Sequence, residues 1–415
     1  MSRHKSALLL VALAYLAFVS LGLPDGLLGV AWPSIRASFG LPLDALGALL
    51  VMFTAGYLVS SFSGGRLLAR TGAGLLLALS CLVTAASLLG YALAPDWWLM
   101  VALGLLAGLG AGAIDAGLNT YAATHFSART VNWLHACYGV GATLGPLIMT
   151  GVLDAGRPWR WGYALVGVWQ LLLAACFGLT RKRWADGAAD TAHGAKELVP
   201  SRAASHARTL RLPAAWLSVA VFFLYTGIEA AAGAWTYSLF TEARSVSAAT
   251  AGLWVSIYYG SLTAGRFLSG VIVGFAPVRL VLRLCIVGIA MGAALIWLNL
   301  DGALNLAGLA LMGFASAPIF PSLIAGTPAR LGDAHTANGI GFQIAAAVLG
   351  QSLLPGLVGL LAGRLGLEVV GPSLLAAALL LLLTYEALEA LSPKSALTSF
   401  ERVELTMKDT KSTKD

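Results

Sequence analysis

The chain has 415 residues, of which 58% are hydrophobic and only 11% are charged. A soluble domain carries about 25% charged residues, so this chain lacks the polar groups needed to cover its own surface in water. Its net charge of +7 is not gathered in a basic patch with interleaved aromatic residues, which argues against a nucleic-acid-binding protein. The composition instead predicts an all-α protein embedded in a lipid bilayer.

Twelve apolar runs follow one another along the chain, each close to the roughly 20 residues that a membrane-spanning helix needs. Each run predicts a helix because the backbone must satisfy its own hydrogen bonds in hydrocarbon. The runs cover 7–31, 45–63, 74–94, 98–122, 134–153, 160–180, 213–238, 247–268, 279–299, 303–326, 338–361 and 370–391.

The distribution of lysine and arginine indicates how these helices are oriented. An even number of spans places both termini on the same side of the membrane, and the loops on that side are rich in basic residues. The opposite loops hold five of the 26 basic residues: Arg36, Arg157, Arg160, Arg244 and Arg364. We therefore predict that both termini are cytoplasmic.

A polar, basic segment rich in alanine and serine divides the chain after the sixth span. We predict a six-helix bundle on either side of it, with a polar tail at the end of the chain. The boundaries are 1–180 for the first bundle, 181–212 for a cytoplasmic linker, 213–391 for the second bundle and 392–415 for a cytoplasmic tail.

The two predicted bundles resemble each other when one is moved by 205 positions. The aligned pairs include Gly65 with Gly270, Gly108 with Gly313, and Gly145 with Gly350. A single offset that holds from the first span of each half to the fifth predicts two pseudo-symmetric, parallel repeats. In such an arrangement the substrate site lies between the halves near the bilayer midplane.

A short motif follows the second span. It contains Gly65, Leu67, Arg70 and Gly72. These positions resemble the signature G-x-L-a-D-R-x-G-R/K that major facilitator transporters carry between spans two and three, although Ala69 stands where aspartate is usual and Ala73 where a basic residue is usual. The resemblance implies a gating loop that contains Gly65, Arg66, Arg70 and Gly72. The alternative interpretation is a tight, positively charged cytoplasmic turn.

Three carboxylates, Asp25, Asp115 and Glu229, lie well inside predicted spans, and no lysine or arginine lies deep enough in a span to neutralise them. A charge at the bilayer centre costs about 2.5–3.5 kcal/mol on insertion scales, and burial without a cation disfavours the charged form. Such acids are suited to load and unload a proton, so we predict that they couple transport to a cation gradient. Carboxyl and amide oxygens also suit sodium. A structural role as hydrogen-bonded, protonated carboxyls is the alternative.

Helical spacing indicates where Asp115 points. Gly104, Gly108, Gly112, Asp115 and Asn119 recur at intervals of three or four residues and therefore form one stripe along the fourth span. Because glycines permit close helix approach, the stripe is predicted to face protein rather than lipid.

Three segments carry a closer resemblance. IDAGLN in the fourth span, Asn132 to Pro146 in the fifth and Tyr225 to Trp235 in the seventh resemble the fucose–galactose–glucose symporter branch of the major facilitators. In its sugar–proton members an acid in the first span and an acid in the fourth carry the proton. The resemblance implies these roles for Asp25 and Asp115, and it implies uptake of a sugar-like solute together with H⁺ or Na⁺.

Other polar side chains in the spans are candidates to bind such a solute, because sugars need paired donors and acceptors and aromatic faces. The candidates are Asn119, Asn132, Tyr138, Gln170, Tyr258, Tyr259, Asn338 and Gln343. Each of them can instead form hydrogen bonds between helices. His135, near the cytoplasmic end of its span, is interpreted as a solvated histidine.

A proton-coupled exporter of drugs or metabolites is the alternative function. Gly141, Gly145 and Pro146 resemble the G-x-x-x-G-P core of the antiporter motif, although Met149 and Thr150 replace its glycine pair. The chain has no H-E-x-x-H, G-x-S-x-G or phosphate-loop motif, so we expect neither an enzyme nor an ATP-driven pump, and no cofactor or metal. We expect a functional monomer that spans the inner (plasma) membrane many times.

Overall fold

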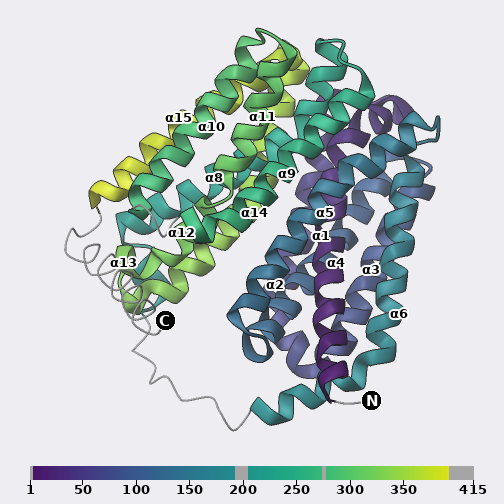
Figure 1. The fold of residues 1–415 in the computed structure, drawn as a ribbon, viewed down its shortest axis with the longest axis vertical. Helices are drawn as coiled ribbons and strands as arrows, with labels where there is room; N and C mark the ends of the chain where they lie inside the picture. Colours follow the sequence, from purple (N-terminus) through teal and green to yellow (C-terminus); the bar gives the residue numbers. More distant parts are fainter. Residues whose placement is uncertain (1–2, 192–203, 273–276, 392–415) are drawn as a thin grey trace. The chain divides into compact units, whose positions relative to one another are not determined.

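A computed structural model describes residues 3–191, 204–272 and 277–391. Every regular element in these ranges is a helix (Figure 1). The predicted all-α fold is therefore confirmed.

The described residues belong to two compact units. The first contains residues from 1–196, 230–263 and 352–370, and the second contains residues from 197–229, 264–351 and 371–415. Two six-helix halves divided at the polar segment stay a prediction.

The amino-terminal helices of the first unit pack against one another mainly in four pairs. They are α1 (Arg3–Phe39), the 3-10 turn η1 (Leu43–Ala45), α2 (Leu46–Thr71), α3 (Ala73–Leu93), α4 (Trp97–His125), α5 (Ala128–Asp154) and α6 (Arg160–Thr191). The main pairs are α2 with α4, α3 with α6, α1 with α5 and α3 with α4. α4 thus packs against both α2 and α3, which places the acid-bearing fourth span inside this group of helices.

Local sequence explains where two of these helices begin. Asp96 caps α4 by accepting a hydrogen bond from the Leu99 amide at 3.0 Å, and Ser127 caps α5 through the Thr130 amide at 3.2 Å. Short polar side chains at this position satisfy backbone donors that have no partner inside the helix.

The remaining helices begin after the polar segment. They are α7 (His206–Thr209), α8 (Pro213–Ser238), a π-helical turn η2 (Leu239–Ala243), α9 (Ala248–Ile272), α10 (Val278–Leu298), α11 (Gly302–Ser316), α12 (Ile319–Ala325), α13 (Thr327–Leu331), α14 (Asp333–Leu365), the 3-10 turn η3 (Leu367–Val369) and α15 (Val370–Leu391). The sequence predicts one continuous helix over 303–326, whereas the structure has a break there between α11 and α12. Pro318 lies at the break and cannot donate a backbone hydrogen bond, which ends the first helix.

Eleven segments within the described ranges are long and apolar enough to cross a membrane. The predicted eighth span corresponds to α9, which is 25 residues long but carries serine, threonine, tyrosine and arginine along its length. α9 lies outside the group of eleven, so the number twelve and the cytoplasmic position of both termini stay predictions.

Candidate functional site

Asp115 lies half-buried on α4 and accepts two hydrogen bonds. The Tyr57 hydroxyl on α2 donates to Oδ2 at 2.6 Å, and the Asn119 amide, one turn further along α4, donates to Oδ1 at 2.9 Å. Sequence reasoning placed Asn119 beside Asp115 but missed Tyr57. The available signal was that Tyr57 is the single tyrosine of the second predicted span.

Glycines bring α2 and α4 close enough for this contact. A Cβ atom at Gly108 would lie 1.9 Å from the Phe53 carbonyl oxygen, and one at Gly112 would lie 2.5 Å from the Tyr57 carbonyl oxygen. On α2, a Cβ at Gly56 would lie 2.1 Å from the Leu105 carbonyl oxygen. The predicted glycine stripe therefore faces α2, and no larger residue fits at these positions.

Asp25 on α1 forms a second acid–tyrosine pair in the same unit. Its side chain is exposed, and Oδ2 accepts a hydrogen bond from the Tyr138 hydroxyl on α5 at 2.6 Å. Glycines again allow the close approach, because a Cβ at Gly22 would lie 2.1 Å from the Tyr138 carbonyl oxygen and one at Gly141 would lie 1.9 Å from the Val19 carbonyl oxygen. Tyr138, a predicted binding residue, is thus brought to a predicted coupling residue.

Glu229 on α8 lies in a different electrostatic environment, within the second unit. Its Oε2 accepts a hydrogen bond from Tyr225 at 2.6 Å, and its Oε1 lies 3.5 Å from Nη2 of Arg266 on α9. The expectation that no cation reaches this acid is wrong, because α9 turns Arg266 toward α8. Tyr225 also lies 3.1 Å from the carbonyl oxygen of Ser316, the last residue of α11 before the break.

The other predicted binding residues are dispersed. Gln170 is buried on α6 and donates to the Ser20 hydroxyl at 3.2 Å. Tyr258 and Tyr259 are buried on α9, with their ring centroids 5.0 Å apart in an edge-to-face arrangement. These three residues belong to the first unit, where Tyr259 packs closely against Gly233 of α8.

Two further candidates lie in the second unit, on α14. Gln343 is buried and accepts a hydrogen bond from Thr327 at 3.0 Å. Asn338 donates to the Ala204 carbonyl oxygen at 2.7 Å and to the Thr209 hydroxyl at 3.1 Å, so it holds the segment around α7. Asn132 lies on α5, but its side chain falls outside the described residues.

The predicted gating loop is mostly helical. α2 continues through Gly65, Arg66 and Arg70 to Thr71, and only Gly72 separates it from α3. Leucine, alanine and arginine in this stretch favour a helix, whereas Gly72 adopts a positive φ of 73° that reverses the chain.

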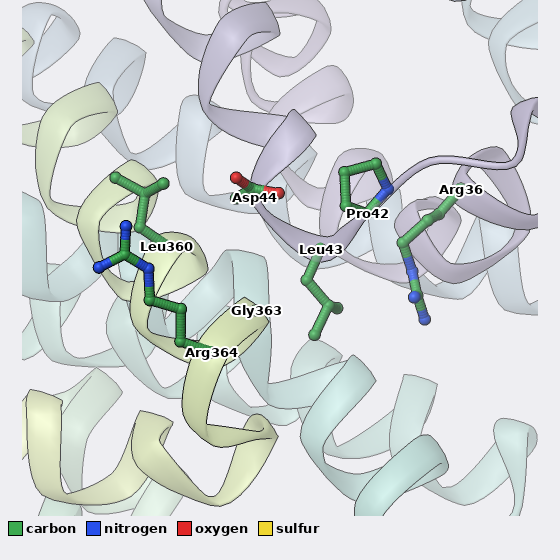
Figure 2. A pocket seen from close by; sticks show the side chains of 7 residues that line it. All are labelled: Arg36, Pro42, Leu43, Asp44, Leu360, Gly363 and Arg364. Carbon is green, nitrogen blue, oxygen red and sulfur yellow. The ribbon is translucent and has the colours of Figure 1, made fainter.

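The predicted outer end of the first unit carries a charged cavity of about 340 Å³ (Figure 2). Its lining residues are Arg36, Pro42, Leu43, Asp44, Leu360, Gly363 and Arg364. Arg36 at the end of α1 also forms an ion pair with Glu242 in η2, which sequence reasoning did not identify. Two of the arginines that were assigned to outer loops, Arg36 and Arg364, therefore line the same cavity as the carboxylate of Asp44.

No group of three or more histidine, cysteine, aspartate or glutamate side chains that could hold a metal ion occurs in the described part of the chain. The Asp115–Tyr57 and Asp25–Tyr138 pairs of the first unit are hydrogen-bonded acids and tyrosines, and such groups are suited to bind protons and hydroxyl groups.

Comparison with known sequences gives one family and two curated relatives. Residues 14–301 match the model of the Major Facilitator Superfamily. The chain is 26% identical over 409 residues to sodium-dependent glucose transporter 1 of Danio rerio, across 86% of this chain and 65% of that protein. It therefore spans less than two thirds of the length of that relative. Sodium-dependent glucose transporter 1A of Mus musculus is 22% identical over 389 residues, across 84% of this chain and 89% of that protein.

Solved transporter structures share the fold. The inward-open xylose transporter XylE from E. coli superposes with a TM-score of 0.71 at 14% identity, covering 92% of this chain and 99% of that chain. The nucleoside transporter NupG superposes with a TM-score of 0.72 at 14% identity, covering 92% of this chain and 99% of that chain. A bacterial homologue of the human lysosomal transporter Spinster gives 0.70 at 13% identity, covering 94% of this chain and 98% of that chain.

Proposed function

Since the chain belongs to the Major Facilitator Superfamily and is a multi-pass membrane transporter rather than an enzyme, we propose that it takes up a sugar or sugar-like solute together with a driving cation. The names of the two curated relatives, both sodium-dependent glucose transporters, support a sugar as substrate and make sodium the competing candidate for the driving cation. We place the protein in the cell's inner (plasma) membrane, where it acts as a monomer.

The observation that carries this proposal is the environment of Asp115. The acid lies on a helix that is long and apolar enough to span the membrane, and each of its carboxylate oxygens accepts one hydrogen bond from a neutral donor. An ionisable residue at such a place is costly and is a functional group by default. Asp115 therefore binds and releases the coupling ion.

The chemistry of its partners favours a proton over sodium. Tyr57 and Asn119 both present donors to the carboxylate, whereas a hard cation such as sodium is held by oxygen acceptors. Protonation makes Asp115 neutral, so the carrier can reorient without moving a bare charge through a dehydrated interface. Asp25, with its Tyr138 partner, is the second coupling acid.

Glu229 serves a different purpose in this proposal. Arg266 lies 3.5 Å from it, so the pair is neutral without a proton. Tyr225 joins the pair to the end of α11 at the helix break. Transporters of this architecture commonly bind substrate beside discontinuous helices, and the Glu229–Arg266 pair contributes polar contacts there.

The antiporter-like glycines do not favour the exporter alternative. A Cβ at Gly141 would lie 1.9 Å from the Val19 carbonyl oxygen, and one at Gly145 would lie 2.5 Å from the Leu23 carbonyl oxygen. These contacts explain both glycines by the packing of α5 on α1.

The test uses the full chain in proteoliposomes, with a panel of sugars and with imposed proton or sodium gradients. We expect accumulation of one sugar driven by the proton gradient. Asp115→Asn, which resembles the protonated acid, should keep sugar counterflow but lose gradient-driven accumulation. Asp154→Asn, an exposed aspartate at the end of α5, is the matched control. Wild-type accumulation by Asp115→Asn, or accumulation driven by sodium alone, would contradict the proton-coupling role.

A further inference from the structure

The Asp115 carboxylate accepts a hydrogen bond from Tyr57 on α2. Within the described part of the chain, this is the one hydrogen bond that joins the carboxylate to another helix. Its hydroxyl lies 2.6 Å from Oδ2, while Oδ1 is occupied by Asn119 of the same helix. Each of these bonds is stronger when the acceptor is a charged carboxylate than when it is a neutral acid. The two donors therefore favour the charged carboxylate, whereas burial of the acid favours its neutral form.

The position of Tyr57 is fixed by packing. The carbonyl oxygen of Tyr57 lies 2.5 Å from where a Cβ of Gly112 would be, and its amide nitrogen lies 2.8 Å from where a Cβ of Gly108 would be. The backbone around Tyr57 is therefore seated directly on α4. Since the helices approach this closely, the hydroxyl cannot leave Asp115 without a change of side-chain rotamer or a shift of α2.

We propose, on the basis of the function proposed above, that Tyr57 is a positioning residue that enables Asp115 to give up its proton during each transport cycle. Without this donor the half-buried acid gives up its proton less readily. The carrier then still exchanges substrate, but it releases the proton too slowly to support net transport. Tyr57 thus acts on the coupling step through Asp115 and has no direct contact with the transported solute.

Other titratable groups near this pair come from α1 and α5. Asp25 on α1 lies within electrostatic reach of Tyr57, and His135 on α5 lies within electrostatic reach of Asp115. Tyr138 on α5 is bonded to Asp25. On α3, the Thr84 hydroxyl faces α4 and does not titrate in this range, and the Tyr91 hydroxyl lies 3.4 Å from where a Cβ of Gly104 would be. Any change in the pH profile must therefore be assigned by comparing variants.

The experiment measures sugar counterflow and net proton-driven uptake in proteoliposomes from pH 5 to 9. In Tyr57→Phe, we expect the alkaline midpoint of counterflow to move upward by about one pH unit, because a hydrogen bond to a charged group is lost. Net uptake should fall while counterflow at acidic pH stays at the wild-type rate. Asn119→Ala removes the other donor and should move the midpoint in the same direction.

Tyr163→Phe is the matched control, because Tyr163 is a buried tyrosine of the same unit with no hydrogen-bond partner for its hydroxyl among the described residues. It should leave the profile unchanged. In an Asp115→Asn background, Tyr57→Phe should cause no further shift. This double variant separates an effect through Asp115 from one through Asp25 or His135.

Two results overturn the inference. One is a Tyr57→Phe profile identical to that of the wild type. The other is an equal shift when Asp115 is already asparagine. If instead the wild-type protein moves no sugar under any gradient, the proposed function itself fails. Thermal unfolding of each purified variant identifies misfolded protein, and Asn119→Ala then provides the independent test of donor loss.

Discussion

Arg330 and Glu389 form a buried ion pair in the second unit, with Nη2 and Oε1 3.2 Å apart and each side chain 4% exposed. Arg279 of α10 reaches the other oxygen of the same carboxylate at 2.7 Å. Glu389 on α15 therefore joins α10 and α13 through one acid.

Glu389→Ala should destabilise the protein strongly, because it leaves Arg330 as an uncompensated buried charge. Breaking a buried pair costs about 3–5 kcal/mol, whereas exposed pairs contribute about 0–1 kcal/mol. Glu386→Ala is the matched control, since its pair with Arg283 is 42% and 46% exposed. Thermal unfolding in detergent should show a large decrease in midpoint for the first variant and little change for the second. Equal midpoints would contradict the structural role of the buried pair.

Gly108→Ala should separate α2 from α4. The added methyl group would lie 1.9 Å from the Phe53 carbonyl oxygen, and forced overpacking costs about 1–3 kcal/mol. Gly178→Ala on α6 is the control, because nothing lies within 4 Å of the new Cβ. We expect a lower unfolding midpoint and loss of uptake for the first variant only. Wild-type uptake by Gly108→Ala would show that this close approach is dispensable.

Arg266→Leu should lower the unfolding midpoint more than the double replacement of Arg266 and Glu229 does. Removing the arginine leaves Glu229 without the cation that lies 3.5 Å away, whereas Arg266→Leu with Glu229→Leu removes both charges together. Unfolding midpoints of the two variants, measured at the same pH, provide the comparison. A double variant less stable than the single one would indicate that the pair contributes favourable energy beyond charge compensation.

A cysteine at position 70 should be labelled only from the cytoplasmic side. Arg70 lies in the last turn of α2, at the end that the distribution of basic residues assigns to the cytoplasm. The experiment uses a background without the four native cysteines, and a cysteine at Gly156 reports the opposite side. Labelling of position 70 by an impermeant reagent in intact cells would reverse the predicted topology.

Sequence reasoning found the features that depend on one helix at a time. The glycine stripe and the Asp115–Asn119 contact follow from helical periodicity, because residues three and four apart share a face. Tyr57 and Arg266 were missed because their contacts depend on how neighbouring helices are rotated about their axes, and composition does not determine that rotation. Pro318 is a local signal for the break between α11 and α12, but the apolar run on both sides of it predicts one continuous helix.

The joint at Gly72 has a mechanical consequence. With one residue between α2 and α3, neither helix can tilt at this end without pulling the other. α3 in turn lies against α6, where a Cβ at Gly74 would be 2.6 Å from the Arg181 Cα atom. We therefore expect the ends of α2, α3 and α6 that meet here to shift together when α2 moves relative to α4.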